Sequence, residues 1–304
     1  MILRHIPVLC EEVVSLLRCE AHQTFVDATL GGGGHTAEIL KKTAPDGRVI
    51  GIEWDEEAIS VAQEVLRPFG ERVRIFRENF TRLPDILEAL EMESVDGILL
   101  DLGLSSIQLE KKERGFSLKG EGPLDMRMDQ RLECTAADLV NALPQQELQE
   151  ILWTYGEERW SRRIAKAIVE ERRRRPILFT SELRAIVLRA IPRRSEPRRI
   201  DPATRTFQAL RIVTNRELDN LKQVLDVGWR FLRKGGRMCV ISFHSLEDRM
   251  VKQTFQRWAG KRGEEGPEEA LLAGVTRKPV VPSEVERMSN PRSRSAKLRC
   301  AERL

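Results

Sequence analysis

The first hundred residues alternate between two hydrophobic patterns, and this alternation constrains the fold more than any other feature of the chain. Four short apolar runs rich in β-branched residues are typical of strands: QTFVDA, GRVIGIEW, RVRIFRE and VDGILLDLG. Between them, HTAEILKKT, DEEAISVAQEVLRPF and RLPDILEALEM carry apolar residues at helical spacing. Strands that alternate with helices form a parallel sheet, so the sequence predicts an α/β fold.

The alternation stops near Ser106, and the chain from Glu133 to about Asn215 has mainly helical patterns. Helix starts are marked by Thr135 with Asp138 three residues on, by Pro144 before QQELQEILWTYG, and by Asp201-Pro202 as an N-cap and first-turn pair. We therefore expect a helical segment inserted into the α/β domain.

After the helical segment the pattern returns to helix, glycine turn, strand and helix in LDNLKQVLDVGWRFLRKGGRMCVISFHSLEDRMVKQTF. GKRGEEGPEE is typical of a surface loop, and NPRSRSAKLRCAERL should end in a strand. These patterns predict an α/β domain formed by residues 1–106 and 216–304, interrupted by a mainly helical domain at residues 107–215.

Positive charge is concentrated in the helical segment. The whole chain has a formal net charge of +4, but from Arg159 to Arg211 sixteen Lys and Arg face only five Asp and Glu. Two clusters, RRIAKAIVEERRRR and RRSEPRRIDPATR, account for most of this excess. A single charged run is usually a solvated helix face, whereas two clusters in one segment favour a polyanionic partner such as a nucleic acid.

Several function classes are excluded by simpler features. No apolar run approaches the ~18 residues of a membrane span, and the N-terminus lacks the pattern of a cleaved leader, so we expect a cytoplasmic protein without a membrane partner. The five cysteines are scattered without metal-ligand spacing, which favours a reducing compartment and predicts no bound metal. The sequence leaves the oligomeric state open, and a homodimer is among the states that it permits.

Four consecutive glycines, Gly31 to Gly34, lie between the first predicted strand and the first predicted helix. This is where an open parallel sheet binds a nucleotide-like ligand, and Glu53 ends the next strand, where an acid suits a ribose diol. One register, Gly32-x-Gly34-x-x-Ala37, also fits a dinucleotide fingerprint. Asp27, however, ends the strand four residues before Gly31. An acid there would repel a pyrophosphate but suits the cationic sulfonium of S-adenosylmethionine (SAM).

The third and fourth predicted strands also end in polar or aromatic candidates. Asn79 and Phe80 follow RVRIFRE, and Phe80 either stacks on an adenine or packs in the core. Asp101 ends GILLD at the carboxyl edge, where the reacting group of such a ligand should lie, although many such residues only cap turns. A glycine turn that binds no ligand remains the alternative for the whole constellation.

Eight blocks of sequence in a fixed order resemble the bacterial 16S rRNA cytosine-N4 methyltransferases of the RsmH (MraW) family, from His5 to Arg299. The blocks are HIPVL, DATLGGGGHT, DLGLSSIQL, RGFSL, GPLDMRMD, IDPATRTFQALRI, ISFHSLEDRMVK and NPRSRSAKLR. The resemblance implies a SAM-dependent Rossmann-like domain with an inserted helical domain. It also implies a cytosine in the decoding region of 16S rRNA, in the small ribosomal subunit, as the substrate.

The resemblance further implies a set of cofactor contacts: Gly33, Gly34, His35, Glu53, Phe80, Asp101 and Gln108. The chain departs from the usual family pattern at Glu53, which replaces Asp, at Ile107, which replaces Pro, and at Thr214, which replaces Val. None of these changes removes a motif, although the longer Glu53 could shift a ribose contact.

Methyl transfer to a cytosine amine requires acceptors near the end of the fourth strand. The amine is a poor nucleophile, so it must be aligned with the methyl–sulfur bond and must lose a proton as charge develops. The candidates are Asp101, the Leu102 carbonyl, Ser105 and Ser106, and the sequence does not rank them. Transfer to ring carbon 5 would instead use a cysteine nucleophile, and no cysteine lies beside the glycine loop or within DLGLSS.

Two histidines and one loop are further candidates. His35 follows the glycines and either touches the cofactor or caps the turn, and the helix N-terminus disfavours its protonated form. His244 either faces the target base or is a packed, hydrogen-bonded residue. Asp125, Arg127 and Asp129 in GPLDMRMD either contact RNA or form a salt-linked turn.

Three functions from different classes remain compatible with the sequence. They are an rRNA cytosine-N4 methyltransferase, a NAD(P)-linked oxidoreductase, and a non-catalytic RNA-binding assembly factor that retains a SAM-binding fold. Cofactor binding separates the second from the first, and transfer of a labelled methyl group separates the third.

Overall fold

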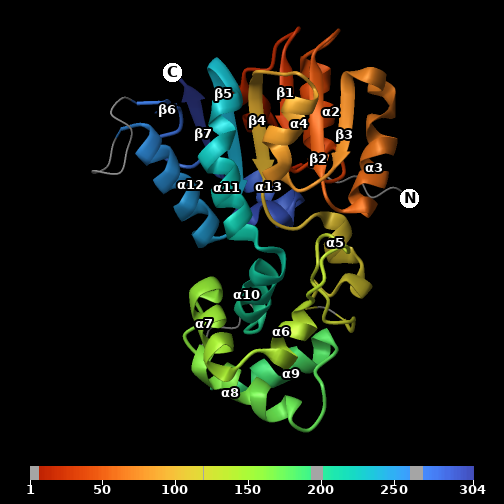
Figure 1. Ribbon diagram of the computed structural model, residues 1–304, viewed down its shortest axis with the longest axis vertical. Helices are drawn as coiled ribbons and strands as arrows, with labels where there is room; N and C mark the ends of the chain where they lie inside the picture. Colours follow the sequence, from red (N-terminus) through yellow and green to blue (C-terminus); the bar gives the residue numbers. More distant parts are fainter. Residues whose placement is uncertain (1–6, 119, 193–200, 261–269) are drawn as a thin grey trace. The chain divides into compact units, whose positions relative to one another are not determined.

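The computed structural model describes residues 7–118, 120–192, 201–260 and 270–304. Its internal contacts divide the chain into two compact units (Figure 1). The first unit contains Met1–Ser105 and Leu218–Leu304, and the second contains Ser106–Glu217. Among the described helices, none is both long enough and apolar enough to cross a membrane.

A seven-stranded sheet with the order β3-β2-β1-β4-β5-β7-β6 forms the centre of the first unit (Figure 1). The five strands from β3 to β5 are parallel, and β7 runs antiparallel to both of its neighbours. The strands are β1 (Thr24–Asp27), β2 (Arg48–Glu53), β3 (Val73–Arg77), β4 (Val95–Asp101), β5 (Leu232–Ser242), β6 (Leu272–Gly274) and β7 (Lys297–Arg303). The predicted α/β fold with a parallel sheet is confirmed.

Helices cover both faces of this sheet, so its central strands are buried on both sides. One face packs on α1 (Cys10–Leu17), α2 (Gly34–Lys42) and α3 (Glu56–Leu66). The other packs on α4 (Leu83–Ala89), α11 (Glu217–Gly228) and α12 (Ser245–Trp258). The shorter elements of this unit are η1 (Arg67–Arg72), η2 (Phe80–Arg82), η4 (Trp229–Phe231), α13 (Glu284–Ser289) and η5 (Pro291–Ser295).

Strand β4 shows why its sequence forms a central strand. Ile98 and Leu100 pack in the core on the α4 side, while Leu99 between them packs in the core on the α2 side. Successive strand residues point to opposite faces, so a strand covered on both faces must be apolar throughout, as GILL is. The run ends at Asp101, where the strand leaves the core.

The strand order bears on the choice between cofactor classes. A dinucleotide-binding fold has two parallel βαβαβ halves, in the order 3-2-1-4-5-6. Here the half beyond β1 contains the antiparallel β7 and the three-residue β6. This arrangement has a first mononucleotide-binding half without a matching second one, which disfavours the NAD(P) reading.

The second unit is mainly helical. Its elements are α5 (Ser106–Glu110), η3 (Lys112–Arg114), α6 (Ala136–Ala142), α7 (Gln145–Gly156), α8 (Ser161–Arg172), α9 (Thr180–Ala190) and α10 (Thr204–Asn215). Thr135 and Asp138 form the predicted capping box of α6, and Pro144 directly precedes α7 as predicted. Asp201 accepts a hydrogen bond from the Ala203 N–H, but α10 begins only at Thr204, slightly later than the sequence suggested.

Two expectations fall wholly or partly on residues outside the described ranges. The surface loop predicted in GKRGEEGPEE includes residues 261–269, and the cluster RRSEPRRIDPATR includes residues 193–200. The strand predicted at the C-terminal end is confirmed as β7.

Candidate cofactor and catalytic site

The glycine loop connects the end of β1 to the start of α2, and two of its glycines have positive φ. Gly33 is the N-cap of α2 with φ 81°, and a Cβ there would lie 3.1 Å from two side-chain atoms of Leu66 on α3. Gly31 has φ 51°, and a Cβ there would meet only the Thr29 carbonyl oxygen, at 3.8 Å. Helix packing therefore explains Gly33, whereas the surroundings of Gly31 leave room for a ligand.

Glu53, at the end of β2, is tied directly to the glycine loop. Its Oε2 accepts a hydrogen bond of 2.8 Å from the Gly31 N–H, and its Oε1 accepts from the N–H groups of Trp54 and Asp55. Burial raises the pKa of Glu53 to about 7 despite these bonds, which favour the ionised form. The lone pairs that remain on Oε2 suit a hydroxyl donor such as a ribose diol.

Asp27, at the end of β1, is completely buried. Its Oδ2 accepts a hydrogen bond of 2.7 Å from the Thr36 hydroxyl, and its Oδ1 accepts one of 3.3 Å from the Thr29 N–H. Burial raises the pKa of Asp27. Its carboxyl group thus holds the loop to α2 and can act on a cation only through its charge.

Asp101, at the end of β4, has one oxygen without a partner. Its backbone N–H donates a hydrogen bond to the Thr29 hydroxyl, and its Oδ2 lies 3.6 Å from His35 Nδ1. Its Oδ1 is buried and accepts no hydrogen bond from the described residues. Burial raises the pKa of Asp101 to about 6. Buried polar atoms almost always have a hydrogen-bond partner. The unpartnered Oδ1 is therefore the strongest indication that this site binds a ligand.

His35 lies in the first turn of α2 and is 6% exposed. Its Nε2 is 2.9 Å from the Val8 carbonyl oxygen, which can only accept, so Nε2 carries a hydrogen. Its Nδ1 lies 3.6 Å from Asp101 Oδ2, a neighbour that the sequence argument, which considered only the helix N-terminus, did not include.

Phe80 makes the contacts of a residue that packs in the core, and His244 makes those of a packed, hydrogen-bonded residue. Phe80, at the start of η2, is half-buried against the core on the α4 side, and Asn79 caps η2 by accepting from the Thr81 N–H. His244 is the N-cap of α12, and its Nδ1 accepts a hydrogen bond of 3.3 Å from the Glu247 N–H. Their roles at adenine and at the target base remain predictions.

The remaining candidates follow β4 in the chain and lie in different units. Ser105 closes the first unit, whereas Ser106 and Gln108 belong to α5 in the second unit. Ser106 and Gln108 are both buried, and the Ser106 hydroxyl has no hydrogen-bond partner among the described residues. Their proposed contacts with cofactor or substrate stay predictions.

The GPLDMRMD segment of the second unit forms a salt-linked turn. Arg127 forms an ion pair with Asp125 at 2.8 Å and donates hydrogen bonds to the carbonyls of Gln130 and Leu132, and Asp129 pairs with Arg131. Asn215, the last residue of α10, holds the middle of this turn. Sequence reasoning missed Asn215, because nothing local to it signals a bond to a segment almost ninety residues earlier.

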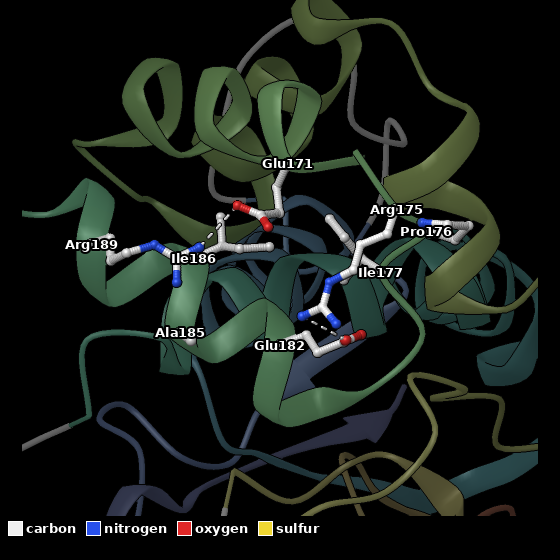
Figure 2. Close-up of a pocket in the computed structure, with 8 residues that line it drawn as sticks. All are labelled: Glu171, Arg175, Pro176, Ile177, Glu182, Ala185, Ile186 and Arg189. Atoms are coloured by element: carbon white, nitrogen blue, oxygen red, sulfur yellow. Dashed lines mark hydrogen bonds and ion pairs between the residues drawn. The ribbon is translucent and has the colours of Figure 1, made fainter. Parts of the chain in front are cut away.

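The arginine cluster at the end of α8 is partly used inside the second unit. Arg172 donates a hydrogen bond to the Val140 carbonyl. Figure 2 shows Arg175 paired with Glu182 and Arg189 paired with Glu171, across a small cavity between α8 and α9. The cavity has a volume of about 60 Å³, far below the ~300 Å³ of typical ligand pockets. Its charges are paired, so we assign it no ligand.

Three arginines in α8 and directly after it have exposed side chains. Arg162, Arg173 and Arg174 make no side-chain ion pair or hydrogen bond within the described part of the chain. Arg162 and Arg173 are eleven residues apart, which returns to nearly the same face of a helix at 3.6 residues per turn. These side chains, rather than the whole cluster, are available to an external anion.

Comparisons with known proteins identify the family. The family model described as the MraW methylase family matches residues 2–304. The chain is 48% identical over 310 residues to the ribosomal RNA small subunit methyltransferase H of Syntrophobacter fumaroxidans, covering 99% of this chain and 97% of that protein. It is 47% identical over 318 residues to the protein of the same name from Symbiobacterium thermophilum, covering 100% and 98%. The chain therefore belongs to the MraW methylase family.

Proposed function

We propose that the protein transfers a methyl group from SAM to the exocyclic N4 of a cytosine in the decoding (P-site) region of 16S rRNA. Membership of a methylase family supports the reaction class. The relatives named ribosomal RNA small subunit methyltransferase H support the class of substrate. The resemblance of the eight sequence blocks supports the choice of cytosine N4.

The observation that carries the proposal is the row of acids at the carboxyl ends of β1, β2 and β4. Asp27, Glu53 and Asp101 surround a loop with bare backbone, and one oxygen of Asp101 is buried without a partner. Such a set of acceptors and negative charges fits SAM, whose sulfonium and amino group are cationic and whose ribose offers hydroxyl donors. Glu53 would hold the ribose, and the bound cofactor supplies an electrophilic methyl group.

The reaction requires a proton acceptor near the amine. As the N4 lone pair forms the new bond to carbon, the electrons of the broken carbon–sulfur bond go to sulfur, and one N4 proton must leave. Asp101 Oδ1 is the candidate acceptor because it is buried, unpartnered and part of a carboxyl group with a pKa of about 6. Ser105, Ser106 and the Leu102 carbonyl would align the amine, and His244 remains a second candidate for the base.

The cysteines disfavour methylation at ring carbon 5. That reaction uses a thiolate nucleophile, and burial raises the pKa of both Cys10 and Cys19 to about 12. Cys239 and Cys300 are buried in β5 and β7. Cys134 lies in the second unit, and its pKa is also raised.

SAM binding can be tested at Gly31 with a matched control. Gly31→Ala places a methyl group in the open space beside the loop and strains a residue with positive φ, so we expect SAM affinity to fall about tenfold, equivalent to about 1.4 kcal/mol. Gly235→Ala in β5 introduces the same kind of strain, with φ 76° and no atom within 4 Å, away from the loop. Calorimetry should show weaker SAM binding for Gly31→Ala alone, and equal affinities of the two variants would contradict the assignment.

RNA binding by α8 and the residues directly after it can be tested at the exposed arginines that form no ion pair among the described residues. Changing Arg173 and Arg174 to Gln should reduce the slope of log K against log salt by about 1.4, because each lost contact with single-stranded RNA removes about 0.7. SAM binding should not change. Lys234→Gln, an exposed change in β5, is the control. A slope equal to that of the wild type would show that the pair is only a solvated helix end.

The proposed function is tested by incubating the protein with methyl-labelled SAM and small ribosomal subunits that lack the modification. We expect label in 16S rRNA and none in large-subunit rRNA. SAM binding without transfer to any form of the subunit would favour the assembly-factor reading. Binding of a nicotinamide cofactor in place of SAM would favour the oxidoreductase.

A further inference from the structure

The proposed function leaves open what keeps Asp101 oriented and charged inside the protein. Three titratable side chains from three different elements act on the charge of the Asp101 carboxyl group: His35 of α2, Asp27 of β1 and Glu247 of α12. Asp27 and Glu247 are both buried, at 0% and 2% exposure. Two of the three neighbours thus carry the same charge as Asp101 and oppose its ionisation, and only His35 favours it.

The geometry of His35 fixes how it meets Asp101. Nε2 carries a hydrogen because it donates to the Val8 carbonyl, so a neutral ring would present a bare lone pair at Nδ1. Nδ1 lies 3.6 Å from Asp101 Oδ2, and two bare acceptors facing each other at this distance would repel. The contact is therefore favourable where one of the two atoms carries a proton.

The imidazole ring of His35 is also fixed on its Nε2 side. Val8, which accepts the Nε2 hydrogen, immediately precedes Leu9, whose N–H donates to Glu286 Oε1 of α13. Val8 and Leu9 are buried, and Leu9 contributes to the same core as α2. The imidazole is thus fixed between the N-terminal segment and the end of β4.

We propose that His35 is a positioning residue that, through its Nδ1 side, holds the Asp101 carboxylate charged and turned so that Oδ1 is left to the reacting amine. The inference rests on the proposed function for the identity of that amine. His35 lowers the pKa of Asp101, whereas Asp27 and Glu247 raise it. Replacing the ring by a neutral side chain leaves Asp101 with like charges only among the described groups that act on it.

The sign of the pH dependence follows from these charges. Asp101 must be ionised to accept a proton, so kcat/KM should fall as the pH is lowered through about 6 in the wild type. Loss of the His35 ring raises the pKa of Asp101. The fall in kcat/KM, which is the acidic limb of the pH profile, then moves to higher pH. Loss of a neighbouring negative charge lowers the pKa and moves the limb to lower pH.

The experiment compares His35→Gln with Asp27→Asn. The Gln amide keeps a donor for the Val8 carbonyl but has no positive charge. We expect the acidic limb of His35→Gln to shift upward by about one unit, so that activity relative to the wild type falls about fivefold more at pH 6 than at pH 8.5. Asp27→Asn should shift the limb downward. Local opening of the fold would reduce the burial of Asp101 and also lower its pKa, so the upward shift in His35→Gln is the change that damage to the fold cannot produce.

A second measurement needs neither cofactor nor RNA. In protein carrying carbon-13 in its Asp carboxyl groups, the Asp101 resonance is identified by its loss in Asp101→Asn and is then titrated in the wild type and both variants. Inflections shifted in the two opposite directions support the proposal. Unshifted inflections overturn it even if the wild type methylates rRNA, whereas shifted inflections in a protein without methyl transfer support His35 and contradict the proposed function.

Discussion

Replacing Asp101 by Asn should reduce the rate of methyl transfer by about 10²-fold or more, within the range for loss of an acid–base group. Asn has nearly the same size and still offers an oxygen, but it cannot take a proton and does not attract a cation. The orphaned Oδ1 at the end of β4 is the structural reason to expect so large an effect. The rate should be measured in single turnovers with saturating SAM.

A separate measurement of SAM affinity divides the two roles open to Asp101. If SAM binding by Asp101→Asn is unchanged while transfer falls, the carboxylate acts on the amine. If affinity and rate fall equally, Asp101 is a cofactor ligand. The group that accepts from the amine is then one of the serines or a backbone carbonyl. Asp85→Asn, in the first turn of α4, is the control for loss of an exposed carboxylate and should leave both quantities unchanged.

Replacing Asn215 by Leu should lower the free energy of unfolding by about 2–6 kcal/mol, because two buried backbone groups each lose a partner worth about 1–3 kcal/mol. The Asn215 side chain is 1% exposed. Its Oδ1 accepts from the Met128 N–H and its Nδ2 donates to the Met126 carbonyl, both at 2.7 Å. Met126 has φ 62°, so the turn is strained and depends on these bonds.

Urea denaturation and hydrogen exchange measure this effect and its location. We expect faster exchange in residues 122–132, with SAM affinity unchanged because the glycine loop belongs to the other unit. Gln253→Leu, on the exposed part of α12, is the control for the same gain in apolar surface. A loss below about 1 kcal/mol for Asn215→Leu would mean that water replaces the amide and that the turn does not need it.

The sheet and the strand ends could be predicted because their signals are local. In a central strand such as β4, the run from Gly97 to Leu100 carries only apolar residues and ends at Asp101, so both the element and the candidate residue can be predicted from one short run. The glycine loop is equally visible. By contrast, β6 has only three residues, too few for any periodic pattern, and the antiparallel position of β7 depends on pairing across the whole sheet.

The contacts within the site could not be predicted because they join distant segments. The family resemblance implies a ligand contact at Gly33. The structure shows a second reason for glycine at this position, because a Cβ added there would lie too close to the side chain of Leu66. The four arginines from Arg172 to Arg175 look equivalent in the sequence, yet Arg172 and Arg175 are bound within the unit and their two neighbours are not. The Asp101 carboxyl group beside His35 is likewise a neighbour that the helix pattern alone does not reveal.

The central claim is tested most directly by the identity of the product. Small subunits without the modification are incubated with the protein and methyl-labelled SAM, the 16S rRNA is digested, and the nucleosides are separated and identified by mass spectrometry. We predict that the label is in cytidine methylated at N4, within a fragment from the decoding region, and that Asp101→Asn lowers its amount by about 10²-fold. Label in 5-methylcytidine, or only on ribose, would contradict the claim.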